Sequence, residues 1–276
     1  MQHKELRIQG SGGLGLYGQV WAPDAEPRAL VVITHGHGEH SGRYVNVGIG
    51  LSSRGFLVAA LDLRGHGRSE GPRGLVMDWG DLHEDLRQFI SQFQPEYPGV
   101  PLFLYGHSVG GLLSLSYVMQ SSNDIKGVIA SAPVLGKPNI PPILFQISKI
   151  LSRVYPTFSM ATQLDPTALS RDPAVVRAYQ DDPLVHSTGT ARLGTELVNT
   201  TEWVQAHAAE LQYPLLLIHG AQDRLVQPAD SRRFFDNVIT QDKTYMDLPD
   251  GFHEPHNDLG KEKVIEAVAD WIEARI

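Results

Sequence analysis

The chain has 276 residues, of which 42% are hydrophobic and 20% are charged, so it is long and apolar enough to bury a full core. This composition excludes a disordered tail and a disulfide-stapled miniprotein. Cysteine is absent, which excludes disulfides, a thiolate nucleophile and cysteine-ligated zinc. The formal net charge is −8, and without a block of lysine and arginine the chain is a poor electrostatic partner for nucleic acid or anionic membranes.

The N-terminal residues MQHKE lack the apolar run of a secretory signal. No segment reaches the roughly 18 to 20 consecutive apolar residues that span a bilayer. These two features predict a soluble, cytoplasmic protein. Any association with a membrane is therefore expected to be peripheral.

Short apolar runs alternate with helix-like patterns along most of the chain, which predicts βα units and a mostly parallel sheet. Residues 4–10 and 14–22, separated by a Gly-Gly turn, predict an opening hairpin. Buried strands are predicted at residues 29–34, 56–61, 101–105, 126–132, 214–219 and 244–248. Among the predicted helices, residues 78–93 place four apolar side chains on one face: Leu82, Leu86, Phe89 and Phe93. A last helix does the same with Val264, Val268 and Ile272. The pattern predicts one doubly wound α/β domain.

Residues 134–213 interrupt this alternation, because they contain no convincing strand. Three helix-like segments follow one another there, at about residues 142–155, 172–180 and 190–210. Helices inserted between two strands of a parallel sheet are best explained as a cap, or lid, over the carboxyl ends of the strands, where α/β sites lie. We therefore predict a core made of residues 1–133 and 214–276, with residues 134–213 as a helical cap.

Two segments match the pattern G-x-S-x-G, residues 67–71 and 106–110. One match arises by chance in a chain of this composition with a probability of roughly 0.2, so structural context must separate them. Ser108 follows the predicted strand at residues 101–105 and precedes a predicted helix, as a nucleophile elbow requires. Ser69 is followed by glycine and proline, which break a helix. Ser108 is the predicted nucleophile, and Ser69 is expected to shape a turn.

A serine hydroxyl becomes a good nucleophile only when a base takes its proton and a carboxylate orients that base. In this arrangement the acid and the histidine should follow the serine in that order, each just after a later strand. Asp223 lies in the loop after the predicted strand at residues 214–219, and His253 lies in the loop after the next strand. We predict a triad of Ser108, Asp223 and His253, with His256 as the competing histidine.

An oxyanion hole requires two N–H donors that are positioned in advance. One is predicted to be the backbone N–H of Val109, the residue after the nucleophile. The second is expected in the loop after the strand at residues 29–34, where residues 35–40 read HGHGEH. Its glycines allow the backbone to turn toward a substrate. We predict that His37 donates through its main chain and not through its imidazole.

Residues 35–44 (HGHGEHSGRY), 62–69 (DLRGHGRS) and 106–111 (GHSVGG) resemble the monoacylglycerol lipase and lysophospholipase branch of the α/β-hydrolase superfamily. The likeness extends over nearly the whole sheet domain. It implies an α/β-hydrolase fold with an inserted cap, a serine esterase without a cofactor or metal, and the same triad and oxyanion donors. His37 departs from the family pattern, because a small residue often occupies that position, and its side chain would narrow the site.

The resemblance also places Glu39, Arg43 and Tyr179 near the polar head of a monoacylglycerol. A structural ion pair between Glu39 and Arg43 is an equally open interpretation. In the cap, apolar residues recur at helical spacing between residues 143 and 158, a stripe that is expected to pack on the core, to line an acyl chain or to touch lipid aggregates. The acyl-binding candidates in this stripe are Ile143, Phe145, Ile147 and Leu151.

These observations predict a monoacylglycerol lipase that cleaves medium- to long-chain monoacylglycerols through an acyl-enzyme. A lysophospholipase or a general carboxylesterase is the alternative, because the sequence defines neither acyl length nor head group nor oligomeric state. A remoter alternative is a dinuclear zinc hydrolase, since residues 34–40 also resemble the H-x-H-x-D-H loop of the metallo-β-lactamase fold, with His35, His37 and His40 as ligands. The last is a catalytically silent hydrolase scaffold that binds a ligand.

Overall fold

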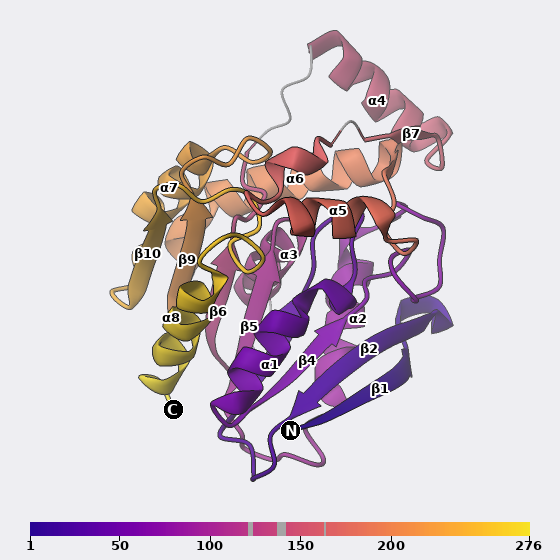
Figure 1. Cartoon of the computed structure of the whole chain (residues 1–276). Coiled ribbons are helices and arrows are strands. Elements are labelled where there is room, and N and C mark those ends of the chain that lie inside the picture. Colours follow the sequence, from indigo (N-terminus) through magenta and orange to yellow (C-terminus); the bar gives the residue numbers. More distant parts are fainter. Residues whose placement is uncertain (121–123, 137–141, 163) are drawn as a thin grey trace.

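A computed structural model of the protein describes residues 1–120, 124–136, 142–162 and 164–276, and of residues 142–145 it describes the backbone only. Eight strands form a central sheet in the order β1-β2-β4-β3-β5-β6-β9-β10 (Figure 1). The β1-β2 and β2-β4 pairs are antiparallel and all the others are parallel. The strands of this sheet are β1 (Gln2–Gln9), β2 (Gly15–Ala22), β3 (Ala29–Thr34), β4 (Phe56–Leu61), β5 (Leu102–His107), β6 (Ile125–Ser131), β9 (Leu215–Gly220) and β10 (Lys243–Leu248).

Helices cover both faces of the sheet. The described helices are α1 (Val45–Ser53), α2 (Trp79–Ser91), α3 (Val109–Gln120), α4 (Pro142–Val154), α5 (Pro173–Asp181), α6 (Ala191–Ala206), α7 (Pro228–Asn237) and α8 (Lys261–Glu273). Short 3-10 turns occur at Ser11–Gly13, Ser41–Tyr44, Pro166–Ala168 and Ala208–Glu210. Figure 1 shows α1 and α8 in front of the sheet and α2 and α3 behind it. The predicted α/β architecture with a mostly parallel sheet is confirmed.

The central strands are buried along their whole length and mostly apolar, because helices cover them on both sides. Strands β3, β4, β5 and β9 are buried at every position. Within β3, Val31 and Ile33 pack in the layer that contains α1 and α8, whereas Leu30 and Val32 pack in the layer that contains α2 and α3. The period-two alternation of a strand thus divides one apolar run between two cores.

The predicted amphipathic helices form as their spacing indicated. Asp78 caps α2, because its carboxylate accepts a hydrogen bond from the backbone N–H of Gly80 at 2.7 Å. The residues that were placed on one face of each helix are all buried: Leu82, Leu86, Phe89, Phe93, Val264, Val268 and Ile272. The first helix is shorter than predicted, because α2 ends at Ser91 and Phe93 follows it. In α2, the capping residue and the apolar face therefore both favour a helix over the same residues.

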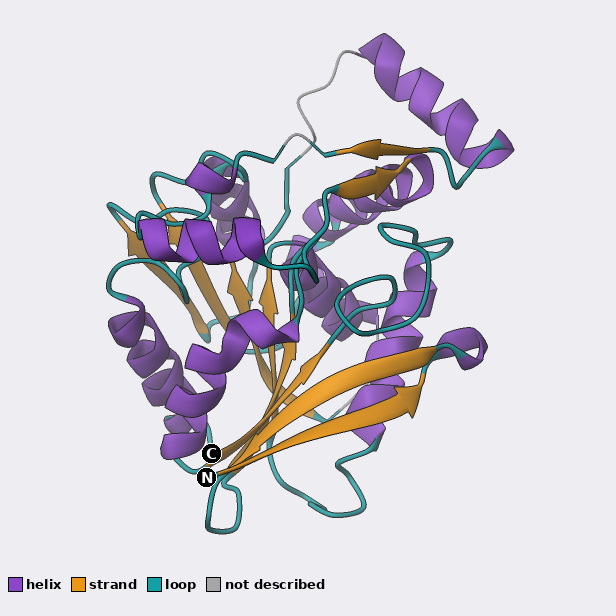
Figure 2. Ribbon diagram, turned by 45° about the vertical axis from the view of Figure 1, so that its right-hand side comes forward, coloured by secondary structure: helices purple, strands orange, loops and turns teal. Residues whose placement is uncertain are grey.

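Residues 134–213, which we call the cap region, lie between β6 and β9. Figures 1 and 2 show their helices α4, α5 and α6 above the carboxyl ends of the parallel strands. The expectation that this region contains no strand is wrong, because β7 (Ser159–Ala161) and β8 (Thr188–Thr190) pair antiparallel in a small separate sheet. Three residues each are too few to show an alternating pattern. That the cap region is a domain distinct from residues 1–133 and 214–276 stays a prediction.

Candidate active site

Ser108 occupies a sharp turn between the end of β5 and the start of α3. Its φ angle is +54°, a left-handed conformation that residues other than glycine seldom adopt and that stores strain. A Cβ atom on Gly110 would lie 2.1 Å from the carbonyl oxygen of Thr34, so only glycine lets α3 start this close to β3. The two features present the Ser108 hydroxyl at the carboxyl end of the sheet.

The three residues predicted as a triad lie together in the structure. Ser108 Oγ is 3.1 Å from His253 Nε2, and His253 Nδ1 is 2.7 Å from Asp223 Oδ2. Asp223 lies in the loop after β9 and His253 in the loop after β10, so neighbouring parallel strands deliver both residues to the same edge. All three side chains are buried, with 8%, 6% and 4% of the surface of Ser108, Asp223 and His253 exposed.

Electrostatics keep Asp223 ionised and make His253 a better base. Burial alone would raise the pKa of Asp223, but the attraction of His253 and hydrogen bonds from His219 and His253 lower it below its usual range. Burial alone would lower the pKa of His253, but the Asp223 carboxylate outweighs that and raises it. With Nδ1–H donated to Asp223, the Nε2 of a neutral His253 is free to accept the Ser108 proton.

Further contacts fix the Asp223 carboxylate. Its Oδ1 atom accepts the backbone N–H groups of Leu225 and Val226 at 2.8 and 3.0 Å. Its Oδ2 atom, already bonded to His253, is also 3.1 Å from His219 Nε2. Sequence reasoning missed His219, which is fully buried at the penultimate position of β9. Its only signal is a histidine inside an otherwise apolar strand.

The two competing candidates, His256 for the base and Ser69 for the nucleophile, lie outside the triad and make structural contacts. His256 stacks on the ring of Tyr44, with centroids 4.5 Å apart, and neither of its ring nitrogens has a hydrogen-bond partner among the described residues. Burial lowers the pKa of His256 to about 4. Ser69 Oγ donates to the carbonyl of Asp62 and accepts the N–H of Tyr17. Ser69 therefore shapes a turn, as expected.

The glycine-containing loop after β3 is held from both sides. The N–H of Gly36 donates to Glu39 Oε1 at 2.7 Å, and the carbonyl of Gly38 accepts the N–H of His186 in the cap region at 2.9 Å. His37, between these two anchors, lines a cavity beside Ser108. Its backbone is thus positioned next to the start of α3, where the predicted partner donor Val109 lies.

The imidazole of His37 packs in a cluster of histidines. Its ring meets those of His66 and His186 edge-on, with centroids 5.6 and 5.5 Å away. Burial and the nearby imidazoles lower the pKa of His37 to about 4, so the ring is neutral at pH 7. The side chain therefore contributes bulk to the site and no charge.

A buried cluster of charged and aromatic side chains borders the same cavity. Arg43 is 2.7 Å from Glu39 and makes two parallel bonds of 2.6 and 2.7 Å to Glu254. The Tyr44 hydroxyl donates to Glu39 at 2.7 Å, and the ring of Tyr179 covers the Arg43 guanidinium at 4.8 Å. The Glu39–Arg43 ion pair thus exists and also lines the cavity. Glu254 was missed by sequence reasoning, and its only signal is its place directly after His253.

The charges of Arg43 and Glu39 are retained in spite of burial. Burial would lower the pKa of Arg43, but Glu254 and Glu39 raise it. Burial would raise the pKa of Glu39, but the attraction of Arg43, followed by that of neighbouring imidazoles, holds it below its usual range. Two carboxylates then face one guanidinium, which leaves the cluster with one net negative charge.

We expect Arg43→Met to lower the free energy of unfolding by about 3 to 5 kcal/mol, because two buried carboxylates lose their only shared cation. Urea unfolding at neutral pH measures this change. Arg54→Met is the matched control, since Arg54 pairs with Glu273 on the surface and surface pairs contribute little. A similar loss in both variants would contradict the interpretation.

Two hollows near Ser108 differ in chemistry. Ser108 lines the first, and the backbone contact of Val134 links it to the second. The first, of about 50 Å³, contains the polar cluster, His253 and Ser108. The second, of about 490 Å³, lies between the cap region and the Asp223 loop. Its apolar lining includes Leu197, Val198, Leu225 and Val226. It also includes Val134, whose N–H donates to the carbonyl of Ser108 at 3.1 Å.

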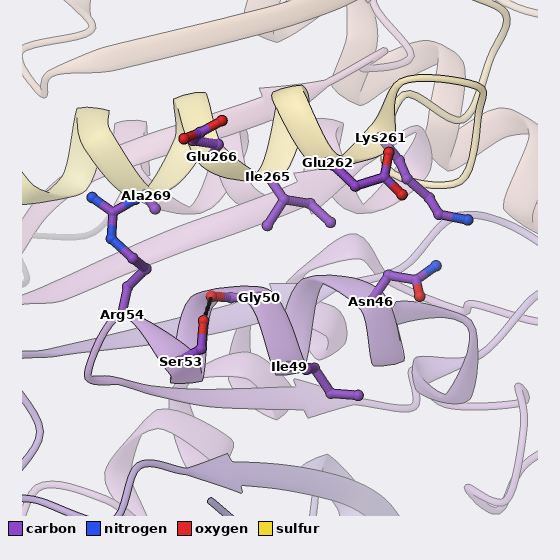
Figure 3. A pocket seen from close by; sticks show the side chains of 10 residues that line it. All are labelled: Asn46, Ile49, Gly50, Ser53, Arg54, Lys261, Glu262, Ile265, Glu266 and Ala269. Carbon is purple, nitrogen blue, oxygen red and sulfur yellow. Dashed lines mark hydrogen bonds between the residues drawn. The ribbon is translucent and has the colours of Figure 1, made fainter.

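A hollow of about 400 Å³ between α1 and α8 contains none of the predicted site residues. Figure 3 shows that charged side chains such as Arg54 and Glu262 surround Ile49 and Ile265 there. It has no nucleophile with an adjacent base. We therefore place the chemistry at Ser108.

The acyl-binding candidates of the cap stripe are not at these hollows. The side chains of Ile143 and Phe145 lie outside the described residues. Ile147 is 47% exposed, and Leu151 is half-buried. Neither Ile147 nor Leu151 lines the cavity or the groove beside Ser108.

The zinc alternative lacks a free ligand set. Both ring nitrogens of His35 bond to backbone groups. His40 Nε2 lies 2.9 Å from Asp182, and its Nδ1 accepts a backbone N–H. Within the described ranges, no group of three or more histidine, aspartate or glutamate side chains is arranged to hold a metal ion.

A nucleophile elbow on a mostly parallel sheet, with hydrogen-bonded serine, histidine and aspartate, defines a serine hydrolase of the α/β-hydrolase fold. The model of the family described as serine aminopeptidase, S33, matches residues 25–260, and the chain belongs to this family. It is 35% identical over 270 residues to a monoacylglycerol lipase of Mycolicibacterium smegmatis, covering 97% of this chain and 96% of the relative.

Two further comparisons agree with this assignment. The monoglyceride lipase of Rattus norvegicus is 33% identical over 96% of this chain and 88% of its own length. The crystal structure of Paleococcus ferrophilus monoacylglycerol lipase superimposes with a TM-score of 0.87 and 35% identity, over 95% of this chain and 99% of that one. The resemblance inferred from the motifs is confirmed, and the protein is a serine ester hydrolase.

Proposed function

We propose that the protein is a monoacylglycerol lipase that hydrolyses medium- to long-chain monoacylglycerols. The observation that carries this proposal is the small polar cavity that Ser108 lines, together with a larger, mainly apolar groove lined by Val134, whose N–H bonds to the carbonyl of Ser108. An ester with a small polar alcohol on one side and an acyl chain on the other matches both spaces. The relatives named as monoacylglycerol lipases support the same substrate.

In the proposed mechanism His253 acts in turn as base and acid, while Asp223 stays ionised throughout. His253 Nε2 takes the proton of Ser108, whose Oγ attacks the ester carbonyl. The negative oxygen that forms accepts the backbone N–H groups of Val109 and His37. His253 then protonates the departing glycerol oxygen, and an acyl group is left on Ser108. A water molecule, deprotonated by His253, releases the fatty acid, while Asp223 stays ionised and stabilises the imidazolium.

The polar cavity is the proposed binding site for the alcohol part of the ester. Its walls carry Glu39, Arg43 and Tyr179, all of which can hydrogen-bond to hydroxyl groups. The cavity is small, at about 50 Å³. A diacyl or triacyl substrate would leave buried polar groups without partners, which costs binding energy. The site thus favours a glycerol that carries one ester.

An aminopeptidase activity, which the family description suggests, requires a carboxylate that is free to bind the α-ammonium group of a peptide. Glu39 and Glu254 line the cavity, but Arg43 already pairs with both. Aminoacyl anilides are therefore expected to be very poor substrates.

We also propose that the cap region touches lipid aggregates. Ile147, Ile150, Val154 and Tyr155 in and after α4, together with Met160 in β7, are between 47% and 79% exposed. Such a concentration of exposed apolar side chains is typical of a surface that contacts lipid. Because the net charge is −8, the contact is apolar and not electrostatic. Among the described helices, none combines the length and apolarity needed to cross a bilayer.

A hydrolysis panel that crosses acyl length with head group tests the proposed function. We expect kcat/KM to rise with acyl length by up to about fourfold per methylene, because each buried methylene contributes roughly 0.8 kcal/mol. Monoacylglycerols should be cleaved well, and triacylglycerols poorly. No gain beyond a four-carbon acyl group would indicate a short-chain esterase, and equal rates on monoacylglycerol and triacylglycerol would indicate a true lipase.

The same panel locates the acyl chain. Leu225→Ala, in the apolar groove, should reduce kcat/KM for long-chain esters more than for acetate esters. Ile49→Ala is the matched control, because Ile49 lines the separate hollow between α1 and α8 (Figure 3). An equal loss for short and long chains in Leu225→Ala would place the acyl chain elsewhere.

A further inference from the structure

Arg43 stands beside the proposed head-group site and would by itself attract an anion. Among the described residues that line the cavity beside Ser108, it is the only lysine or arginine. A guanidinium matches phosphate in shape and charge, and burial strengthens such a pair. An unoccupied Arg43 would therefore favour phosphate-bearing lipids over a neutral glycerol.

Glu254 binds the two guanidinium nitrogens of Arg43 that a phosphate would bind. Its two carboxylate oxygens bond to Nη1 and Nη2 of Arg43 at 2.6 and 2.7 Å. Glu39 adds a third bond to Nη1 at 2.7 Å, and the Tyr179 ring lies over the guanidinium. Since two carboxylates surround one guanidinium, an approaching anion meets a net negative charge.

The surroundings hold the Glu254 carboxylate in this position. Its side chain is only 2% exposed. Asn257 Nδ2 donates to Oε2 at 3.1 Å, and the backbone N–H of Glu254 donates to the carbonyl of Leu169 at 2.9 Å. A buried carboxylate that Arg43 and Asn257 both bind does not swing away to make room for a ligand.

We propose that Glu254 is a specificity-determining residue that excludes phosphate-bearing head groups by occupying Arg43. This inference rests on the proposed function and narrows its substrate class to monoacyl esters of uncharged alcohols. Glu254 acts through Arg43 and touches none of the reacting atoms, so it is a positioning residue. Its removal changes which head group is accepted and leaves the triad in place.

Glu254→Gln tests the proposal, because glutamine keeps the size of the side chain and one acceptor oxygen while it removes the charge and the two-pronged bond to Arg43. The substrates are monolauroylglycerol and monolauroylglycerol phosphate. We expect the ratio of kcat/KM for the phosphate ester to that for the neutral ester to rise at least about tenfold, mainly through a lower KM for the phosphate ester, since like charges side by side oppose binding. Glu254→Asp, which restores the carboxylate, should return the ratio toward that of the wild type.

Glu262→Gln, at an exposed carboxylate on α8, is the matched control and should leave the ratio unchanged. Hydrolysis of p-nitrophenyl butyrate, which has no lipid head group, shows that each variant is folded and active. An unchanged ratio in an active Glu254→Gln enzyme would overturn the proposal.

A measurement on the wild type needs no variant. Monolauroylglycerol phosphate should be cleaved poorly and should compete only weakly with monolauroylglycerol, and strong competition would overturn the role of Glu254. The proposed function fails in a different way. If the wild type cleaves p-nitrophenyl butyrate and no monolauroylglycerol, the monoacylglycerol assignment falls, and the inference built on it falls too.

Discussion

Replacing Ser108 with alanine should lower kcat roughly a millionfold, because the reaction loses the nucleophile whose attack the rest of the triad serves. The hydroxyl is hydrogen-bonded to His253 at 3.1 Å and strained into position at a φ of +54°. A fluorophosphonate should therefore label one site per wild-type chain, and peptide mapping should locate the adduct on Ser108. The residual rate reflects only the oxyanion donors and substrate binding.

Ser69→Ala is the control for this experiment, because Ser69 belongs to the other G-x-S-x-G match and its hydroxyl bonds to the backbone of Asp62 and Tyr17, not to the triad. It should retain labelling and most of the activity, with some loss of stability. Stoichiometric labelling that persists in Ser108→Ala would show that the nucleophile is a different residue.

Asp223→Asn should lower kcat by about ten-thousandfold, because an amide no longer fixes the tautomer of His253 or stabilises its charged form. The carboxylate lies 2.7 Å from His253 Nδ1 and is itself bonded to His219 and two backbone N–H groups. Single-turnover kinetics with an activated ester measures the loss. Asp250→Asn, in an exposed loop before His253, is the control and should keep near-normal activity.

The pH dependence of kcat/KM follows from the same pair. His253 must be neutral to accept the serine proton, so activity falls as the pH drops through its pKa. Asp223 raises this pKa above the ordinary imidazole value of about 6.5, so the wild type should lose activity already below neutral pH. In Asp223→Asn the attraction is gone and burial lowers the pKa, so the remaining activity should extend to lower pH. An acid limb that is unchanged by the substitution would contradict this coupling.

Local sequence patterns predicted much of the fold because buried parallel strands and amphipathic helices carry their own signals. Strands β3 and β4 begin and end at the predicted residues, since each is a continuous apolar run between polar turns. Helix α1 (Val45–Ser53) was not predicted, because Gly48 and a second glycine lower helix propensity. The structure explains Gly48, since a Cβ there would lie 2.4 Å from the ring of Trp21. Long-range packing, not propensity, forms this helix.

The sequence by itself determined the nucleophile elbow, the order of Ser108, Asp223 and His253, and the α/β class, because those features depend on short segments and their succession. Only the tertiary structure decided the environment of the site. Glu254 meets Arg43 across 211 residues of sequence, and His219 reaches Asp223 because a turn follows β9. The packing of α4 against α6 decides which side chains of the cap stripe are exposed and which are half-buried. Strands and loops that are distant in the sequence come together at one edge of the sheet, and their contacts determine the charge, burial and hydrogen bonding of the site. A local sequence pattern does not contain this information.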